Sequence, residues 1–205
     1  MKRYNYNISA YSITSVLVII IIIAFLIGNN FIVEWIMSVN IATKNLRNEF
    51  FPSFSTDIDD YLQFVPALLL LGLKFSGYKG DMDNKRFALF FLIATAVTQI
   101  IIYALKLYIS ELRPDGSDTL SSPSGHTATA FMIATMLYLQ YNKRSFWYTI
   151  FGYSCATAVG LMRVLNNRHW IFDVIVGASL GIIITYWAYR KTERILRNRA
   201  SDKNK

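Results

Sequence analysis

The chain has 205 residues, of which 54% are hydrophobic, and its mean hydropathy is +0.33. This composition is too apolar for a typical soluble domain and the length allows a single domain, so we predict an integral membrane protein. The formal net charge is +8, but the basic residues are dispersed among apolar segments, which argues against nucleic acid as a partner. The single cysteine, Cys155, excludes an intramolecular disulfide.

The first apolar segment covers residues 11–33 and follows the basic residues Lys2 and Arg3. A secretory signal peptide is one interpretation, but Asn29-Asn30-Phe31 gives no small-x-small cleavage pattern after the segment. We therefore predict a transmembrane helix over residues 11–33. Residues 32–50 then repeat apolar side chains at helical spacing with charged residues elsewhere, which predicts a helix lying in the membrane interface.

Phe50, Phe51 and Phe54, with Pro52, lead into an acidic stretch at residues 57–60. This segment leaves two interpretations open, an ordinary surface loop and a lip through which lipid enters. Five further apolar segments follow, and we predict them to be transmembrane helices. They cover residues 61–75, 87–109, 126–141, 146–162 and 174–189. Residues 190–205 are polar and basic and are predicted to form a cytoplasmic tail. The predicted fold is all-α: a single domain with a six-helix transmembrane bundle and an interfacial helix after the first span.

Small residues recur at every fourth position in the last two predicted spans. They are Gly152, Ala156 and Gly160 in one span and Gly177 and Gly181 in the other. This spacing lets helix backbones approach closely in lipid, so we expect both helices in the core of the bundle.

Basic residues are divided unequally between the two sides of the predicted bundle. With six spans, both termini share the side that holds most of the lysines and arginines, including the seven basic residues of the tail. The positive-inside rule makes this side cytoplasmic. The candidate functional residues then lie together on the opposite face, at the outer ends of the third to sixth helices.

The stretch Ser122-Pro123-Ser124-Gly125-His126 has the pattern of a helix start. Ser122 suits the N-cap and Pro123 the first turn, because proline has no N–H to lose there. The N–H groups of Ser124 and Gly125 would point out of the positive end of the helix, where a phosphate binds. His126 would lie beside that anion as a proton donor. A plain helix cap with a chance histidine is the alternative that this stretch alone leaves open.

Three cations accompany this helix start. Lys106 and Arg113 are seven residues apart, almost two helical turns, so we expect both on one face of the third helix until Pro114 ends it. Taken alone, two such cations could extend toward lipid headgroups. Together with Arg163 they suit a multiply charged anion.

His169 and Asp173 are spaced i, i+4, which on a helix places the carboxylate beneath the imidazole. A carboxylate there fixes the tautomer and makes the other ring nitrogen a better nucleophile or base. A metal site formed by His126, His169 and Asp173 is the competing interpretation. The nearby cations would repel a divalent ion and attract phosphate, so we predict no metal and no cofactor.

Three segments resemble the signature motifs of the type 2 phosphatidic acid phosphatase superfamily, which comprises membrane lipid phosphatases and vanadium-dependent haloperoxidases. They are Lys106-x6-Arg113-Pro114, Pro123-Ser124-Gly125-His126 and Arg163-x5-His169-x3-Asp173. The likeness runs from the third to the sixth predicted helix, and the six-span layout extends it over nearly the whole chain. Met162 departs from the pattern, because the third motif usually has serine before the arginine.

The resemblance implies a mechanism without a metal. His169 would attack phosphorus and form a phosphohistidine, with Asp173 orienting it, while His126 would protonate the leaving oxygen and later activate water. The phosphate-binding residues that it implies are Lys106, Arg113, Ser124, Gly125 and Arg163. Outside the motifs, Arg168 is either a contact to a headgroup or second phosphate or an ordinary exposed arginine. Asp115 and Asp118 either tune the entrance of the site or are solvated loop acids, and we favour the solvated loop.

The sequence therefore predicts a hydrolase acting on a phosphomonoester or diphosphate of a membrane lipid. Candidate substrates are phosphatidate, phosphatidylglycerol phosphate, undecaprenyl diphosphate and the phosphates of lipid A. A lipid phosphotransferase using the same intermediate and a non-catalytic lipid-phosphate binder are the alternatives, and a haloperoxidase is the weakest rival. The small bundle suggests a bacterial inner membrane, with both termini in the cytoplasm and the active site on the periplasmic face. The sequence gives no oligomeric state.

Overall fold

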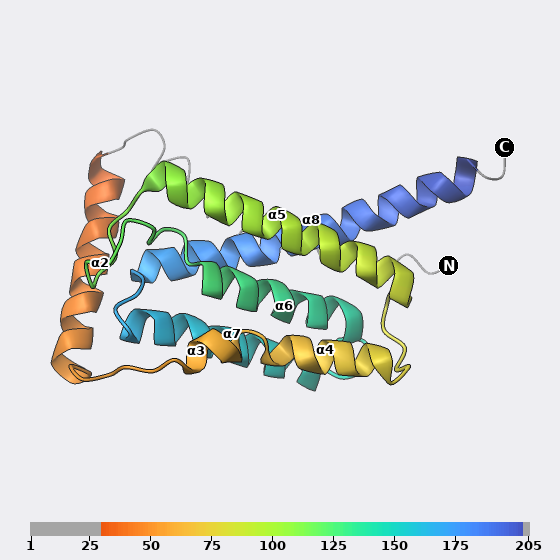
Figure 1. The fold of residues 1–205 in the computed structure, drawn as a ribbon, viewed down its shortest axis with the longest axis horizontal. Coiled ribbons are helices and arrows are strands. Elements are labelled where there is room, and N and C mark those ends of the chain that lie inside the picture. The colour runs from red at the N-terminus through yellow and green to blue at the C-terminus, as the bar shows by residue number, and fades with distance from the viewer. Residues whose placement is uncertain (1–29, 203–205) are drawn as a thin grey trace.

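The computed structural model describes residues 30–202, and all regular secondary structure in this part of the chain is helical (Figure 1). The helices are α2 (Asn30–Phe50), α3 (Ile58–Leu62), α4 (Val65–Phe75), α5 (Asn84–Ile109), α6 (Gly125–Tyr141), α7 (Trp147–Leu165) and α8 (Ile171–Asp202). The all-α prediction is thus confirmed for the described residues, and a helix is present where one was predicted at residues 32–50.

Helix α6 lies in the middle of the bundle and packs against α4, α5, α7 and α8 (Figure 1). Its neighbours approach through the small residues that the sequence singled out. A Cβ atom added to Gly181 of α8 would lie 2.3 Å from the carbonyl oxygen of Ala128, and one added to Gly152 of α7 would lie 3.3 Å from the Cα atom of Ala134. The spacing of small residues therefore marks the faces of α7 and α8 that pack on α6.

Two helices of the described chain are long and apolar enough to cross a membrane, namely α5 and residues 171–198 of α8. Helix α5 turns large apolar side chains outward, among them Leu92, Ile100 and Leu107, which suits a surface in contact with lipid. The first predicted span, residues 11–33, lies almost wholly outside the described residues, and its last four residues belong to α2. The six-span bundle accordingly stays a prediction.

Two predicted elements differ from the structure. The continuous span predicted at residues 61–75 is divided into α3 and α4, and Pro66 lies in the first turn of α4, where its missing N–H and fixed φ favour a new helix start. The basic segment predicted as a tail from residue 190 continues α8 as far as Asp202. Arginine and lysine are good helix formers, so a polar extension of an apolar helix needs no break.

Helix α2 lies across the end of the bundle where α5 and α7 end and where α6 and α8 begin (Figure 1). Side-chain hydrogen bonds join it to the loop after α5 and to the last residue of α7. Lys44 donates to the carbonyl of Pro114 at 2.8 Å, and Arg47 donates to the carbonyl of Leu165 at 2.7 Å. This end of the molecule carries the residues that the sequence singled out.

Candidate active site

A pocket of about 500 Å³ opens at the α2 end of the bundle. Three of the predicted site residues, Arg113, His126 and Arg163, line it. The other lining residues are mostly polar or charged: Ser55, Thr56, Asp57, Asp60, Asp115, Asp118, Asn166 and Arg168. The remaining predicted residues lie behind this lining and are described in turn below.

The start of α6 differs from the prediction in two respects. The helix begins at Gly125, and its N-cap is Ser124, whose side chain accepts a hydrogen bond from the Thr127 N–H. The assignment of Ser122 as the cap was wrong, because Ser124 has the extended backbone that an N-cap needs, with φ −68° and ψ 114°. The Ser124 N–H was expected to be open to an anion, but it donates to the Asp173 carbonyl at 3.0 Å. Ser124 is fully buried, so its part here is to join α6 to α8.

His169 and Asp173 are buried side by side. His169 lies in the turn before α8 and not on the helix itself, and its Nδ1 is 3.6 Å from Oδ2 of Asp173, slightly beyond hydrogen-bond range. The same Oδ2 accepts hydrogen bonds from the hydroxyl of Ser121 at 2.6 Å and from the N–H of Trp170 at 2.8 Å. These donors fix the carboxylate beneath the imidazole.

Burial lowers the pKa of His169 to about 4, and the Asp173 carboxylate opposes this shift only in part. The ring is therefore neutral near pH 7. Its Nε2 lies 3.3 Å from Nη1 of Arg113, on the side that leads to the pocket. A buried neutral imidazole with one nitrogen facing a carboxylate and the other facing the pocket can act as a nucleophile or a base.

Arg113 does not lie on the third predicted helix. Helix α5 ends at Ile109, because Ser110 adopts a left-handed backbone conformation with φ 50° and caps it. Arg113 therefore lies in the following loop, where Nε donates to Asp118 at 2.7 Å and Nη1 donates to the carbonyl of Arg168 at 3.0 Å. Lys106 remains on α5 and donates to the carbonyls of Leu120 and Ser121. In this structure Lys106 orders the 110–124 loop.

Asp115 and Asp118 lie exposed in the 110–124 loop, as the favoured interpretation expected, and each is also paired with an arginine. Arg113 and a backbone hydrogen bond lower the pKa of Asp118. Asp115 lies 3.3 Å from Arg168, so Arg168 also has an acidic partner. The pairing of Asp115 with Arg168 was not predicted, because nothing in the sequence places this loop against the turn that precedes α8.

Helix α3 supplies two site residues that sequence reasoning missed. Asp59 is buried, and its Oδ2 lies 2.7 Å from Nη1 of Arg163. Asp60 borders the pocket, and its Oδ1 lies 2.9 Å from Nε2 of His126 and 3.3 Å from the same Arg163 nitrogen. The acidic stretch at residues 57–60 was thus more than a loop or a lip: it provides the direct partners of a histidine and an arginine of the signature motifs.

The two histidines have separate carboxylate partners, Asp60 for His126 and Asp173 for His169. A metal site would need His126, His169 and Asp173 to converge on one ion. Within residues 30–202, no group of three or more histidine, cysteine or acidic side chains is arranged to hold a metal.

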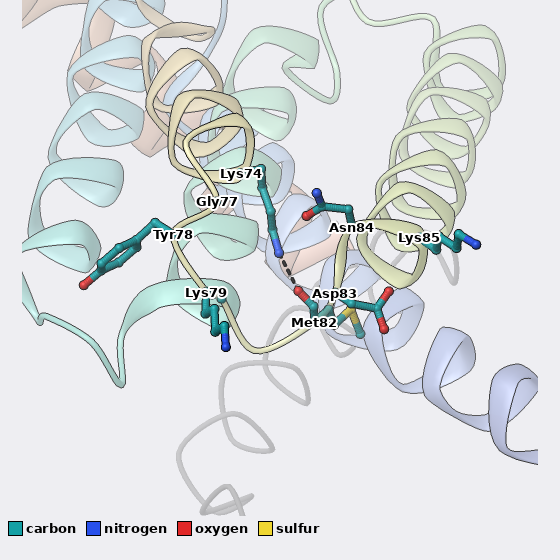
Figure 2. Close-up of a pocket in the computed structure, with 9 residues that line it drawn as sticks. Lys74, Gly77, Tyr78, Lys79, Met82, Asp83, Asn84 and Lys85 are labelled. Carbon is teal, nitrogen blue, oxygen red and sulfur yellow. Dashed lines mark hydrogen bonds between the residues drawn. The ribbon is translucent and has the colours of Figure 1, made fainter.

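A second pocket, of about 540 Å³, lies at the opposite end of the bundle, between the end of α4 and the start of α5 (Figure 2). Lys74 points into this region and donates to the carbonyl of Met82, and its Nζ also contacts the Gln140 side chain at 2.9 Å. The predicted site residues do not line this pocket. Lys74 therefore joins α4, α6 and the 76–83 turn and has no connection to the histidines.

The comparisons with known proteins agree with this fold, and the residues that the family model matches include the three motifs. A model of the PAP2 superfamily matches residues 87–197, more than half of the chain, and the chain belongs to this superfamily. It is 40% identical over 147 residues to the lipid A 1-phosphatase of Porphyromonas gingivalis, an alignment that covers 71% of this chain and 33% of that protein. The chain thus matches about a third of the length of that relative.

Two further likenesses come from Bacillus subtilis. The chain is 27% identical over 149 residues to phosphatidylglycerophosphatase B, with 66% of this chain and 70% of that protein covered. The crystal structure of a transmembrane PAP2-type phosphatidylglycerolphosphate phosphatase superposes with a TM-score of 0.57 at 20% identity, covering 93% of this chain and 98% of the other. At that identity the superposition establishes the fold alone.

Proposed function

We propose that the chain is a lipid phosphate phosphatase that hydrolyses a phosphomonoester or diphosphate of a membrane lipid through a phosphohistidine on His169. The observation that carries the proposal is the placement of this residue. Its Nδ1 faces Asp173, its Nε2 faces Arg113, and burial keeps the imidazole neutral. The family membership and the names of the relatives support a lipid phosphate as substrate.

In the first step, the Nε2 lone pair of His169 attacks phosphorus. A phosphorus–nitrogen bond forms as the bond from phosphorus to the leaving oxygen breaks, and His126 gives that oxygen a proton. The imidazole becomes positively charged, and Asp173 stabilises it through Nδ1–H. The 3.6 Å separation of these two groups is expected to shorten when the charge develops, as catalytic hydrogen bonds commonly tighten in the complex.

In the second step, His126 takes a proton from water and the resulting hydroxide oxygen attacks phosphorus. The phosphorus–nitrogen bond breaks, inorganic phosphate leaves, and neutral His169 is restored. Both steps spread negative charge over the phosphoryl oxygens, which preorganised cations stabilise. We assign this role to Arg113 and Arg163, which line the pocket, with Lys106 and the N–H of Gly125 behind them.

Arg113 must turn from His169 toward the substrate for this reaction, because its guanidinium lies against Nε2 in the free protein. A phosphate group is the stronger partner for that guanidinium, since it offers two charged oxygens in fork geometry. Phosphate binding would therefore uncover the nucleophile. Ser124, buried at the helix cap, contributes by holding α6 and the Gly125 N–H in place.

The relatives' names order the candidate substrates. We rank a lipid A phosphate first, supported by the 40% identity to a lipid A 1-phosphatase over a third of that protein's length, and phosphatidylglycerol phosphate second. Phosphatidate and undecaprenyl diphosphate are the other candidates. We also propose the six-span topology in a bacterial inner membrane, with both termini cytoplasmic and the site periplasmic. The inferred sidedness follows from the distribution of basic residues.

The test is phosphate release by the purified full-length protein in detergent with EDTA, on each of the four lipids. Wild type is expected to release phosphate, and His169→Asn, which keeps a polar side chain of similar shape, is expected to release none. Equal melting temperatures of the two proteins would show that the loss is chemical. Wild-type protein that is folded but inert on every lipid would contradict the proposal.

A further inference from the structure

The adjacent acids of α3 differ in their surroundings although both contact Arg163. The Asp59 side chain is 1% exposed, and besides Arg163 it holds Asn166, whose Nδ2 donates to Oδ1 at 3.1 Å. The Asp60 side chain is 49% exposed and borders the pocket. Asp59 is therefore a fixed partner of Arg163, whereas Asp60 lies where it can turn into solvent.

One oxygen of Asp60 joins the two groups that the proposed reaction directs at the substrate. Its Oδ1 lies 2.9 Å from Nε2 of His126 and 3.3 Å from Nη1 of Arg163. In the proposed reaction, these nitrogens serve the leaving oxygen and the phosphoryl oxygens. A carboxylate oxygen and a phosphoryl oxygen make the same charge-assisted contacts with guanidinium and imidazole. The Asp60 carboxylate thus occupies a position that an oxygen of the substrate must take.

We propose that Asp60 holds the place of a substrate oxygen in the free enzyme and is displaced when the phosphate group binds. This inference rests on the proposed function of the site. Displacement leaves Arg163 oriented, because Asp59 keeps its shorter contact of 2.7 Å. Asp60 is accordingly a positioning residue that keeps His126 and Arg163 aligned before the substrate arrives, and it competes with every oxyanion for them.

Competition of this kind predicts that removing the Asp60 charge strengthens oxyanion binding. Breaking an exposed ion pair changes a binding equilibrium by up to about fivefold. Removing the Asp60 charge also removes its repulsion of the bound phosphate, which strengthens phosphate binding further. We expect Asp60→Asn to bind inorganic phosphate about three- to tenfold more tightly than wild type. A residue that only supported the fold would change affinity in the opposite direction.

The experiment measures the dissociation constant of inorganic phosphate by titration calorimetry on the full-length protein in detergent. The variants are Asp60→Asn and Asp60→Ser, with Asp57→Asn as the matched control, because Asp57 is an exposed acid of the same pocket. Both Asp60 variants should bind more tightly than wild type, and the Asp57 variant should stay within about twofold of it. Asp59→Asn should weaken binding, because Arg163 loses its fixed partner.

Asp60 variants that bind phosphate no more tightly than wild type, or a wild type and variants that bind none, would overturn the inference. The calorimetric readout needs no turnover, so the inference and the proposed function can fail separately. If wild type hydrolyses lipid but Asp60→Asn has the same phosphate affinity as wild type, the inference about Asp60 fails and the proposed function is retained. If Asp60→Asn binds phosphate more tightly but the protein hydrolyses none of the four lipids, the proposed hydrolase function fails and the proposed competition between Asp60 and phosphate is retained.

Discussion

Replacing Asp59 by alanine tests whether the buried ion pair with Arg163 holds the site together. The Arg163 side chain is 10% exposed and that of Asp59 is 1% exposed, so the change leaves a buried guanidinium without its closest partner. Breaking such a pair by removing one member costs about 3–5 kcal/mol of folding free energy. Asp60 keeps a contact of 3.3 Å with Arg163, which places the expected loss at the lower end, about 3 kcal/mol.

For a chain of this length, about 3 kcal/mol corresponds to a melting temperature lower by about 6–12 °C. The assay is tryptophan fluorescence during thermal unfolding in detergent, at one scan rate for all proteins. Asp60→Ala is the control, because an exposed pair contributes at most about 1 kcal/mol. Phosphate release by Asp59→Ala should also fall, by about a hundredfold, since a displaced cation no longer stabilises the phosphoryl charge. Equal melting temperatures for the two alanine variants would refute the reasoning.

The remaining predictions concern a buried acid and a helix contact. Burial and the neighbouring carboxylate of Asp173 raise the pKa of Glu111 to about 8, so the folded protein holds this proton between the ordinary carboxyl pKa and about 8. The free energy of unfolding of wild type should therefore fall as pH rises through that window. Glu111→Gln resembles the protonated acid, so it should match wild-type activity at pH 7 and have a higher melting temperature than wild type at pH 9. Gly181→Ala should lower the melting temperature, because its Cβ would lie 2.3 Å from the Ala128 carbonyl oxygen. Gly72→Ala is the control: nothing lies within 4 Å of its Cβ, so this change should be neutral or stabilising by up to about 1 kcal/mol. Unchanged pH dependence in Glu111→Gln, or equal effects of the two alanines, would count against these assignments.

Hydrophobic runs and motif spacing predicted most of the helices and the placement of the motif residues at one end of the bundle. Long apolar segments leave few alternatives to helix in a membrane protein, and small residues every fourth position mark the faces that pack. Arg113, His126 and Arg163 line one pocket, and His169 faces Asp173, as their order in the motifs suggested.

Local backbone geometry was harder to predict. Ser122 and Ser124 are both suitable N-caps, and the preference for proline in the first turn favoured the wrong one. The end of α5 depends on a left-handed serine at position 110, which no sequence pattern marks because serine seldom adopts that conformation. Arg113 therefore belongs to a loop that the sequence assigned to a helix.

Tertiary ion pairs were the part that sequence could not reveal. Asp59 and Asp60 are more than a hundred residues from Arg163 along the chain, and no spacing rule connects them. Sequence could indicate only that a partner was required, because a charge that is buried beside an apolar segment must be paired. It could not indicate which residue the partner is.

The central claim is a covalent phosphohistidine on His169, and trapping it is the most direct test. Wild-type protein would be mixed with a lipid labelled in its phosphate and quenched in alkaline detergent within the time of one turnover. The account predicts a label that survives alkali, is lost in acid, maps to His169 by peptide mass and is missing from His169→Asn. Product formed without any labelled protein on the time scale of one turnover, or a label that maps to another residue, would contradict it.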